Sequence, residues 1–220
     1  AGGYPETRAN HKDDYEPLKG LDEAKKRGIS FVSGDRKREG ILPNLSIFEN
    51  LLFGLYRKNF RVPGARFIDW LVLSDIFDWE VERLSIKTGP KSNLITSLSG
   101  GNQQKVVIGR SFALQPKIMV LNDPARGIDV DTKRDLYQYL REYAAEGNSV
   151  IYMTSELEEF IGFCSRAVVF RNGSIFDEFV DQEVEPVGIL EGMFGRVRGG
   201  PSAINDHGQN EERQGKAGSE

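Results

Sequence analysis

The sequence predicts an α/β protein with a parallel sheet covered on both faces by helices. From residue 98 onward, short apolar runs alternate with segments of helical periodicity. This alternation is typical of parallel strands joined by helical crossovers. The chain has 220 residues, of which 39% are hydrophobic, so it can bury a substantial core. We therefore expect one α/β domain with a small insert.

The expected elements follow a regular order along the chain. Residues 28–35, GISFVSGD, are expected to form a buried strand that leaves into the charged loop DRKREG. Two apolar runs around Asn172-Gly173 predict a C-terminal β-hairpin, because this dipeptide favours a tight hairpin turn. The remaining elements after the Gly-Gly turn are expected in this order: helix 102–114, strand 118–121, helix 131–145, strand 149–154 and helix 156–163.

A helical insert is expected at residues 41–96. Ser46 and Glu49 have the spacing of a capping box, so a helix is expected to begin after Ser46. Residues 66–86 are expected to continue as helix. The aromatic residues of this second helix are interpreted as core rather than as a ligand-binding box. They are Phe67, Trp70, Phe77 and Trp79.

Composition and charge disfavour several kinds of function. The net charge of −4 argues against bulk attraction to nucleic acid. Both histidines lie in the polar segments 1–20 and 197–220, which are expected to be flexible, so no histidine base or metal ligand is expected in the core. The single Cys164 excludes an intrachain disulfide and is interpreted as a small buried apolar residue. No segment approaches the roughly 20 apolar residues that span a bilayer, and none resembles a signal peptide, so the chain is expected to be soluble.

Two stretches carry residues that suit phosphate chemistry. SLSGGNQQK, residues 97–105, places a serine and two glycines directly before a helix, where bare amides and the helix dipole favour a phosphate. Taken alone, this pattern is more simply interpreted as a turn. MVLNDPARGID, residues 119–129, ends an apolar strand on Asn122 and Asp123, and Ser155 follows the next strand. Functional groups of parallel sheets gather at these strand ends.

The ordered set of these motifs resembles the ATP-binding-cassette (ABC) family. LSGG is the family signature, and here it is followed by an apolar strand, an Asp-Pro pair and RGID. The form LSGGNQQK, the upstream GDRKREG and the later TSELEE are similar to the sugar-importer ATPases of the ribose, galactose and xylose type. Those ATPases carry two nucleotide-binding domains on one polypeptide. The resemblance covers residues 28–195 and implies the C-terminal nucleotide-binding domain, with the ABC-type P-loop NTPase-like fold.

The resemblance implies a phosphate site that works across two domains. Ser99, Gly100 and Gly101, with Gln103 nearby, would bind the γ-phosphate of ATP held by the opposite domain. Asp129 would lie in the loop that passes between the two domains.

At the strand ends, the chain departs from the family pattern. An aspartate that holds Mg²⁺ and a glutamate that polarises water are replaced by Asn122 and Asp123. Ser155 occupies the position of a switch histidine, and Gly34 stands where a glutamine or glutamate contacts the metal and the membrane partner. We therefore assign Asp123 and Ser155 to catalysis, and Asn122 and Gly34 to altered metal positions.

The phosphate-cradling motif G-x-x-x-x-G-K-[ST] has no match in the chain. In the family it lies upstream of the signature, so residues 21–196 are expected to be an ABC domain truncated on its N-terminal side and inactive in isolation. An amide at residue 122 would bind Mg²⁺ weakly, which suggests that this domain's own metal site is a relic. The alternative is that Asn122 only caps a strand and hydrogen-bonds locally.

The expected function is that of the ATP-binding subunit of a sugar importer. It would use ATP and Mg²⁺ at the cytoplasmic face of the plasma membrane, together with a second nucleotide-binding domain, permease subunits and, indirectly, a sugar-binding protein. No nucleic acid partner is expected. A DNA-repair or chromosome-maintenance ATPase is disfavoured, because the insert is too short for coiled-coil arms and the charge is acidic. An inactive fragment or regulatory module remains the alternative.

Overall fold

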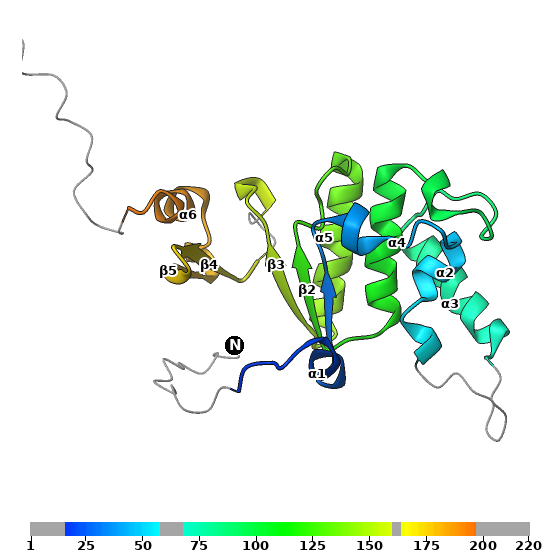
Figure 1. Cartoon of the computed structure of the whole chain (residues 1–220). Coiled ribbons are helices and arrows are strands. Elements are labelled where there is room, and N and C mark those ends of the chain that lie inside the picture. Colours follow the sequence, from blue (N-terminus) through cyan, green and yellow to red (C-terminus); the bar gives the residue numbers. More distant parts are fainter. Residues whose placement is uncertain (1–15, 58–67, 160–163, 197–220) are drawn as a thin grey trace, which may run out of the picture. The chain divides into compact units, whose positions relative to one another are not determined.

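The computed structural model describes residues 16–57, 68–159 and 164–196, and the chain divides into two compact units, Ala1–Ser155 and Glu156–Glu220. Figure 1 shows the elements of both units. The single domain expected over residues 21–196 spans this division and remains a prediction.

The first unit contains a sheet of three parallel strands, as predicted. These are β1 (Ile29–Val32), β2 (Ile118–Asn122) and β3 (Ser149–Met153), in the order β1-β2-β3. Phe31 lies beside Val120, and Val120 lies beside Ile151, which sets the register. The carboxyl ends of the three strands therefore meet at one edge of the sheet.

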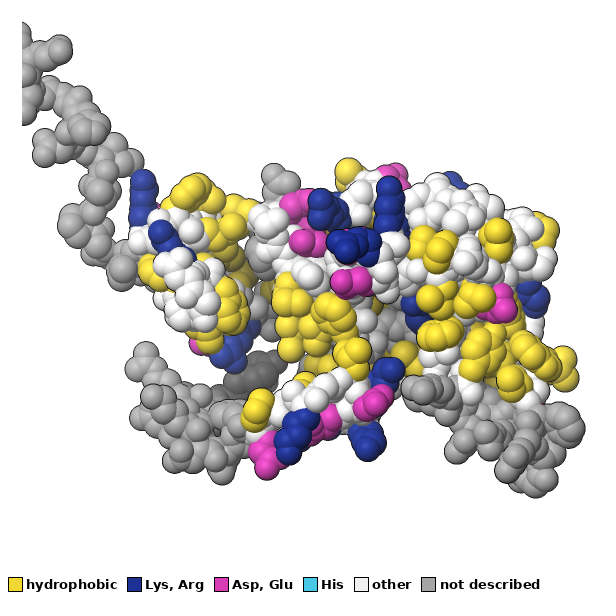
Figure 2. Space-filling model, viewed as in Figure 1, with side chains coloured by type: hydrophobic (Ala, Val, Ile, Leu, Met, Phe, Trp, Pro, Cys, Tyr) yellow, Lys and Arg dark blue, Asp and Glu magenta, His cyan; other side chains and the backbone are white. Residues whose placement is uncertain are grey.

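The two faces of this sheet differ in how they are covered. On one face, Val32 and Leu121 are buried, and helices α4 (Gly100–Ala113) and α5 (Val130–Ala145) pack against the strands. On the other face, Phe31 and Ile151 are each 51% exposed, and hydrophobic side chains are visible over the strands in Figure 2. Coverage of both faces by helices is therefore not seen in the described part of this unit.

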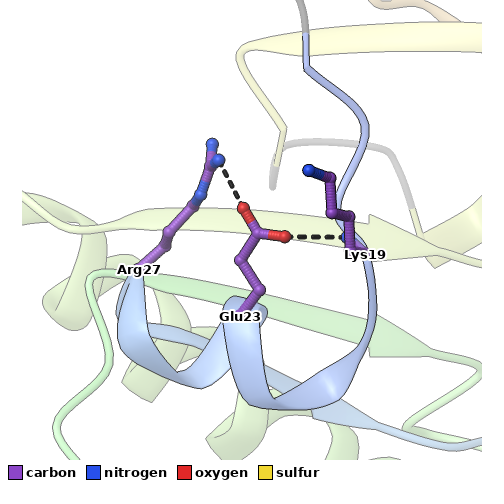
Figure 3. Close-up of polar contacts among 3 residues, drawn as sticks. All are labelled: Lys19, Glu23 and Arg27. Carbon is purple, nitrogen blue, oxygen red and sulfur yellow. Dashed lines mark hydrogen bonds and ion pairs between the residues drawn. The ribbon is translucent and has the colours of Figure 1, made fainter.

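A short helix, α1 (Leu21–Lys26), precedes β1 and was not expected from the sequence. Its Glu23 carboxylate accepts a hydrogen bond from the Lys19 backbone N–H at 2.8 Å and pairs with Arg27 at 2.5 Å (Figure 3). The helix buries none of its residues, so it has no apolar face for periodicity to detect.

The loop expected after β1 is a single π-helical turn, η1 (Arg36–Gly40). It is followed by α2 (Ile47–Leu52), whose predicted capping box is confirmed: the Ser46 hydroxyl accepts from the Glu49 amide, and the Glu49 carboxylate accepts from the Ser46 amide. Two 3₁₀ turns, η2 (Leu55–Arg57) and η3 (Ile95–Ser97), complete the insert together with α3.

Helix α3 spans Trp70–Arg83 and is shorter than the predicted helix at residues 66–86. Its start is determined by Asp69, whose carboxylate accepts from the amides of Leu71 and Val72. Among the aromatic residues interpreted as core, Phe77 is buried, whereas Trp70 is 58% and Trp79 is 65% exposed. The core interpretation was therefore wrong for the two tryptophans; Phe67 lies outside the described residues.

Helices α4 and α5 agree with the sequence prediction to within two residues at each end. The insert packs on α4, because its helices α2 and α3 both contact α4. A Cβ on Gly109 of α4 would lie 3.1 Å from Leu84 Cδ1, so the glycine permits this close approach.

The second unit contains the predicted hairpin, formed by β4 (Arg166–Arg171) and β5 (Ser174–Val180). Asn172 and Gly173 both have positive φ, at 51° and 77°, as a type I′ turn requires. Helix α6 (Pro186–Met193), which follows the turn η5 (Asp181–Glu183), packs Ile189 into a small core with Ala167, Val169 and Phe179.

The helix predicted at residues 156–163 is a 3₁₀ turn, η4 (Leu157–Glu159), and residues 160–163 lie outside the described part. Cys164 is half-buried, and burial raises the pKa of its thiol to about 11, in agreement with an unreactive side chain. None of the helices in the described part of the chain combines the length and the hydropathy that crossing a membrane requires.

Candidate functional site

The LSGG segment lies at the N-terminal end of α4. Ser99 is the N-cap residue, but its side chain does not cap the helix, since its hydroxyl accepts a hydrogen bond from Asn102 Nδ2 at 2.9 Å. Within the described residues, no side chain caps the amides that open α4. The first turn thus presents unsatisfied N–H groups and a positive dipole end, and the two glycines add no side chain to hinder an anion.

The side chain of Gln103 is hydrogen-bonded to the segment that precedes α4. Its side-chain amide donates a hydrogen bond to the carbonyl of Leu98 at 3.0 Å, which ties the first turn of α4 to the segment before it. The Gln103 backbone amide donates to the Ser99 carbonyl at 2.9 Å. Both hydrogen bonds of Gln103 therefore help to hold the first turn of α4 in place.

Asp129 lies beside the signature. Its Oδ2 atom is 4.0 Å from the position that a Cβ would occupy on Gly101. The carboxylate accepts from the backbone amide of Thr132 at 2.9 Å and from the Thr132 hydroxyl at 2.8 Å, so it caps α5. These hydrogen bonds lower the pKa of Asp129, which keeps the carboxylate ionised. The structure therefore brings Ser99, Gly100, Gly101 and Asp129 together, and we call these residues the signature group.

A second set of predicted residues meets at the edge of the sheet. A Cβ on Gly34 would lie 3.0 Å from the backbone oxygen of Asn122 and 3.4 Å from Asp123 Cβ, so the loop after β1 approaches the end of β2 closely. We call Gly34, Asn122 and Asp123 the strand-end group. Ser155 lies two residues beyond the end of β3 and is exposed.

The backbone holds Asp123 in an unusual conformation. Its φ of 43° lies in the left-handed region, which aspartate tolerates better than most residues. Its amide donates to the Met153 carbonyl at 2.8 Å, and its carbonyl accepts from the Arg126 amide at 3.1 Å. Asp123 is therefore anchored between the ends of β2 and β3 and begins the turn that leads to Asp129.

One residue near the signature was missed by sequence reasoning. The guanidinium NH2 atom of Arg36 lies 3.0 Å from the Cβ position of Gly100. The charged run DRKREG marks a polar loop, but the sequence contains no signal that this loop folds back onto the start of α4.

The two groups fit a phosphate and a metal ion to different degrees. The signature group suits a phosphate, because open amides and a glycine without a side chain form its surface. The strand-end group contains one carboxylate, and the described residues contain no cluster of three or more His, Cys, Asp or Glu. A magnesium ion at this edge would depend on water and on phosphate oxygens for most of its ligands.

Comparison with known proteins reveals relatives across most of the chain. A ribose import ATP-binding protein of Mesorhizobium japonicum is 36% identical over 182 residues, which cover 83% of this chain and 33% of that protein. A xylose import ATP-binding protein of Pseudomonas savastanoi is 34% identical over 81% of this chain and 33% of that protein. An uncharacterised ABC transporter ATP-binding protein of Escherichia coli is 36% identical over 70% of this chain. The chain spans about a third of the length of these curated relatives.

Solved structures agree on the fold. An ATP-binding cassette solved as a dimer with ADP and phosphate, in a post-hydrolysis state, superposes with a TM-score of 0.61 over 72% of this chain and 66% of that chain, at 23% identity. At this level of identity, the likeness supports the fold alone. A family model described as ABC transporter matches residues 10–126, which is more than half of the chain. By this match and by its curated relatives, the chain belongs to the ABC transporter family.

Proposed function

We propose that this chain is the nucleotide-binding part of a sugar importer, in which ATP binding and hydrolysis drive carbohydrate transport across the membrane. Its task is to offer the signature group to the γ-phosphate of an ATP molecule held by a second nucleotide-binding domain. The single observation that carries this proposal is the uncapped, glycine-lined start of α4. The printed names of the relatives, which include ribose and xylose import proteins, support a sugar as the transported class.

In this proposal the ATP site is composite, because the second nucleotide-binding domain holds the ATP molecule and this chain supplies the signature group. Open amides at a helix start bind a phosphate through hydrogen bonds and the dipole. Asp129 adds a charged cap beside Gly101, in the loop that would meet the opposite domain. ATP with Mg²⁺ is then held between the two domains, and its hydrolysis belongs to the assembled pair.

The strand-end group would form the remnant of a second metal site. Asn122 offers a neutral amide where a carboxylate would offset the charge of Mg²⁺, and Asp123 and Ser155 occupy the positions for polarising water and for the switch residue. Such a site would bind the metal weakly and contribute little turnover of its own.

The helical insert offers a surface for the permease. Figure 2 shows hydrophobic side chains over α2 and α3. Among the residues of these helices and their ends, four hydrophobic side chains are more than half exposed: Phe53, Trp70, Leu71 and Trp79. Exposed aromatic residues are enriched at the centres of protein interfaces. In our proposal this surface docks on the cytoplasmic side of the permease, which in turn receives sugar from a binding protein.

The first test uses the assembled importer with a Gly101→Asp substitution in this chain. A carboxylate among the open amides repels the phosphate, so ATP hydrolysis should fall by roughly a hundredfold or more. The control is Thr96→Asp, which places the same charge on an exposed residue of the preceding turn and should leave hydrolysis unchanged. Normal hydrolysis by the Gly101→Asp importer would overturn the proposal.

A second test is calorimetric titration of MgATP into the isolated chain. Because the composite site needs the opposite domain, no binding is expected at micromolar concentrations. Binding with 1:1 stoichiometry at micromolar affinity would show that the chain has a phosphate-binding site of its own, and the account of a composite site would then fail.

The Asn122→Asp variant, assayed for Mg²⁺-dependent turnover with the partner's site disabled, tests the strand-end group. Full turnover by the unsubstituted chain in that assay would contradict a remnant site.

A further inference from the structure

The side chain of Arg36 lies directly over the start of the signature helix. Its NH2 atom is 3.0 Å, and its guanidinium carbon 3.7 Å, from the position of a Cβ on Gly100. Gly100 is the first residue of α4, and Arg36 is the first residue of η1, 64 positions earlier. The absence of a side chain at Gly100 is what lets the guanidinium come this close.

The fold holds Arg36 in this place. Its Cγ and Cβ atoms lie 3.4 and 3.5 Å from the Cβ position of Gly40, so the aliphatic stem packs across the π turn. The Arg36 carbonyl accepts from the Ile41 amide at 2.9 Å, which closes the turn. The neighbouring Lys37 and Arg38 are exposed, whereas Arg36 is half-buried.

Arg36 has no acidic partner within the part of the chain that the structure describes. Its Nε atom is buried there without a hydrogen-bond partner. The carboxylates of the same region are engaged elsewhere. Asp35 accepts from the Arg38 amide, Glu39 accepts from the Ser33 hydroxyl, and Asp129 accepts from Thr132.

This arrangement places a guanidinium beside the positive end of a helix. Two positive groups in contact are unfavourable, and a buried guanidinium nitrogen without a partner adds a desolvation cost. An anion at the same place relieves both, because it accepts hydrogen bonds from the helix amides and from the planar guanidinium. The carboxylate of Asp129 stands on the Gly101 side of the opening and leaves the Gly100 side, next to Arg36, as the better place for the anion.

We infer that Arg36 is a cationic phosphate ligand of the signature site, acting beside the amides of Gly100 and Gly101. This inference rests on the proposed function, since the phosphate is the γ-phosphate of the ATP held by the opposite domain. Arg36 also belongs to the loop that begins at Gly34, so this ligand ties the strand-end group to the signature group within one domain.

The test measures MgATP hydrolysis by the assembled importer with three substitutions in this chain. Arg36→Met keeps an apolar stem that can pack on Gly40 but removes the charge, and should raise KM for MgATP about tenfold or more. Arg36→Lys keeps the charge and should recover most of the affinity, within about threefold of the unsubstituted importer. Arg38→Met removes a neighbouring exposed arginine and should leave KM unchanged.

The outcomes separate this inference from the proposed function. If Gly101→Asp abolishes hydrolysis while Arg36→Met leaves KM and kcat unchanged, the signature site stands and the role of Arg36 is refuted. An Arg36→Lys importer as impaired as Arg36→Met would also refute it, since charge would not be the cause. Normal hydrolysis with Gly101→Asp would overturn both. Thermal unfolding of each isolated chain identifies a variant that fails only because it does not fold. A rise in KM that is accounted for by loss of folding counts against the inference.

Discussion

The guanidinium of Arg110 donates two hydrogen bonds to Asn50, from Nε to the backbone oxygen at 2.6 Å and from NH2 to Oδ1 at 3.2 Å. A third bond runs from NH1 to the carbonyl of Gly40 at 2.7 Å. Asn50 is fully buried, and its amide nitrogen donates to the carbonyl of Leu42. Arg110 on the signature helix therefore binds both the entry to the helical insert and its first helix, which fixes the insert relative to α4.

Removing this arginine should weaken the first unit. Burial lowers the pKa of Arg110 to about 10, so the charge is retained at neutral pH but depends on these three acceptors. Arg110→Met leaves the acceptors unpaired, and the free energy of unfolding in urea should fall by about 2–4 kcal/mol. The matched control is Arg134→Met on the exposed side of α5, where no more than about 0.5 kcal/mol should be lost. Equal losses in both variants would contradict a structural role for the Arg110 network.

Glu80 should make stability depend on pH. Burial raises the pKa of this carboxyl to about 7, and Arg83, 3.9 Å away, only partly opposes the shift. The Oε2 atom is buried without a partner in the described structure. The folded chain therefore holds a proton that the unfolded chain has released between the ordinary value of 4.5 and about pH 7, so stability falls as pH rises through this window and remains lower above it.

Replacing Glu80 by glutamine should remove this dependence. At pH 8 the Glu80→Gln variant should be more stable than the unsubstituted chain by on the order of 3 kcal/mol, and near pH 4.5 the two should agree. Urea unfolding at several pH values measures the difference. The control is Glu82→Gln, which changes an exposed neighbour on the same helix. Parallel stability curves for the Glu80→Gln and unsubstituted chains would rule out a buried titrating carboxyl.

Gly34 should not tolerate a side chain. A Cβ at this position would lie 3.0 Å from the carbonyl oxygen of Asn122, a backbone atom that cannot rotate away. Gly34→Ala should cost about 1–3 kcal/mol in urea unfolding, and Gly34→Gln, which introduces the residue type of the family's metal position, should fold no better. Gly101→Ala is the matched control, because its nearest neighbours lie at ordinary contact distances of 3.9 and 4.0 Å. A stable Gly34→Gln chain would show that the loop after β1 can move away from β2.

Substitutions at Asp129 can separate its role as the cap of α5 from the interdomain role that we propose. Its carboxylate caps α5, so Asp129→Ala should lower the thermal unfolding midpoint, whereas Asp129→Asn should preserve it, since asparagine caps equally well. The lowered pKa means that the contribution of the charge is present at neutral pH and is lost as pH falls below the ordinary value of 3.8. If the charge also serves the interdomain loop, Asp129→Asn will slow hydrolysis by the assembled importer without lowering the midpoint. Unchanged hydrolysis would limit Asp129 to capping.

Local signals in the sequence predicted much of what the structure shows. The capping box at Ser46, the Asn172-Gly173 turn and the helices on either side of β2 are each specified by neighbours within a few residues. Helix α1 had no such signal, because none of its residues is buried and its six residues carry no apolar stripe. No local signal in the sequence indicated that Trp70 and Trp79 are exposed, since helical spacing alone does not say which side of a helix meets the core.

Residue identity and short-range spacing were enough to predict the family, the signature motif and the order along the chain of β1, α2 to α5, the other parallel strands and the hairpin. Which residues share a site, in contrast, depends on contacts between segments that are far apart in the sequence. The parallel register places Asp123 beside Met153, and the close approach at Gly34 joins two segments that are 88 positions apart. The contact between Arg36 and Gly100 likewise joins two segments that are far apart in the sequence. Such contacts depend on how the sheet, the π turn and α4 pack together, and no local pattern in the chain encodes that packing.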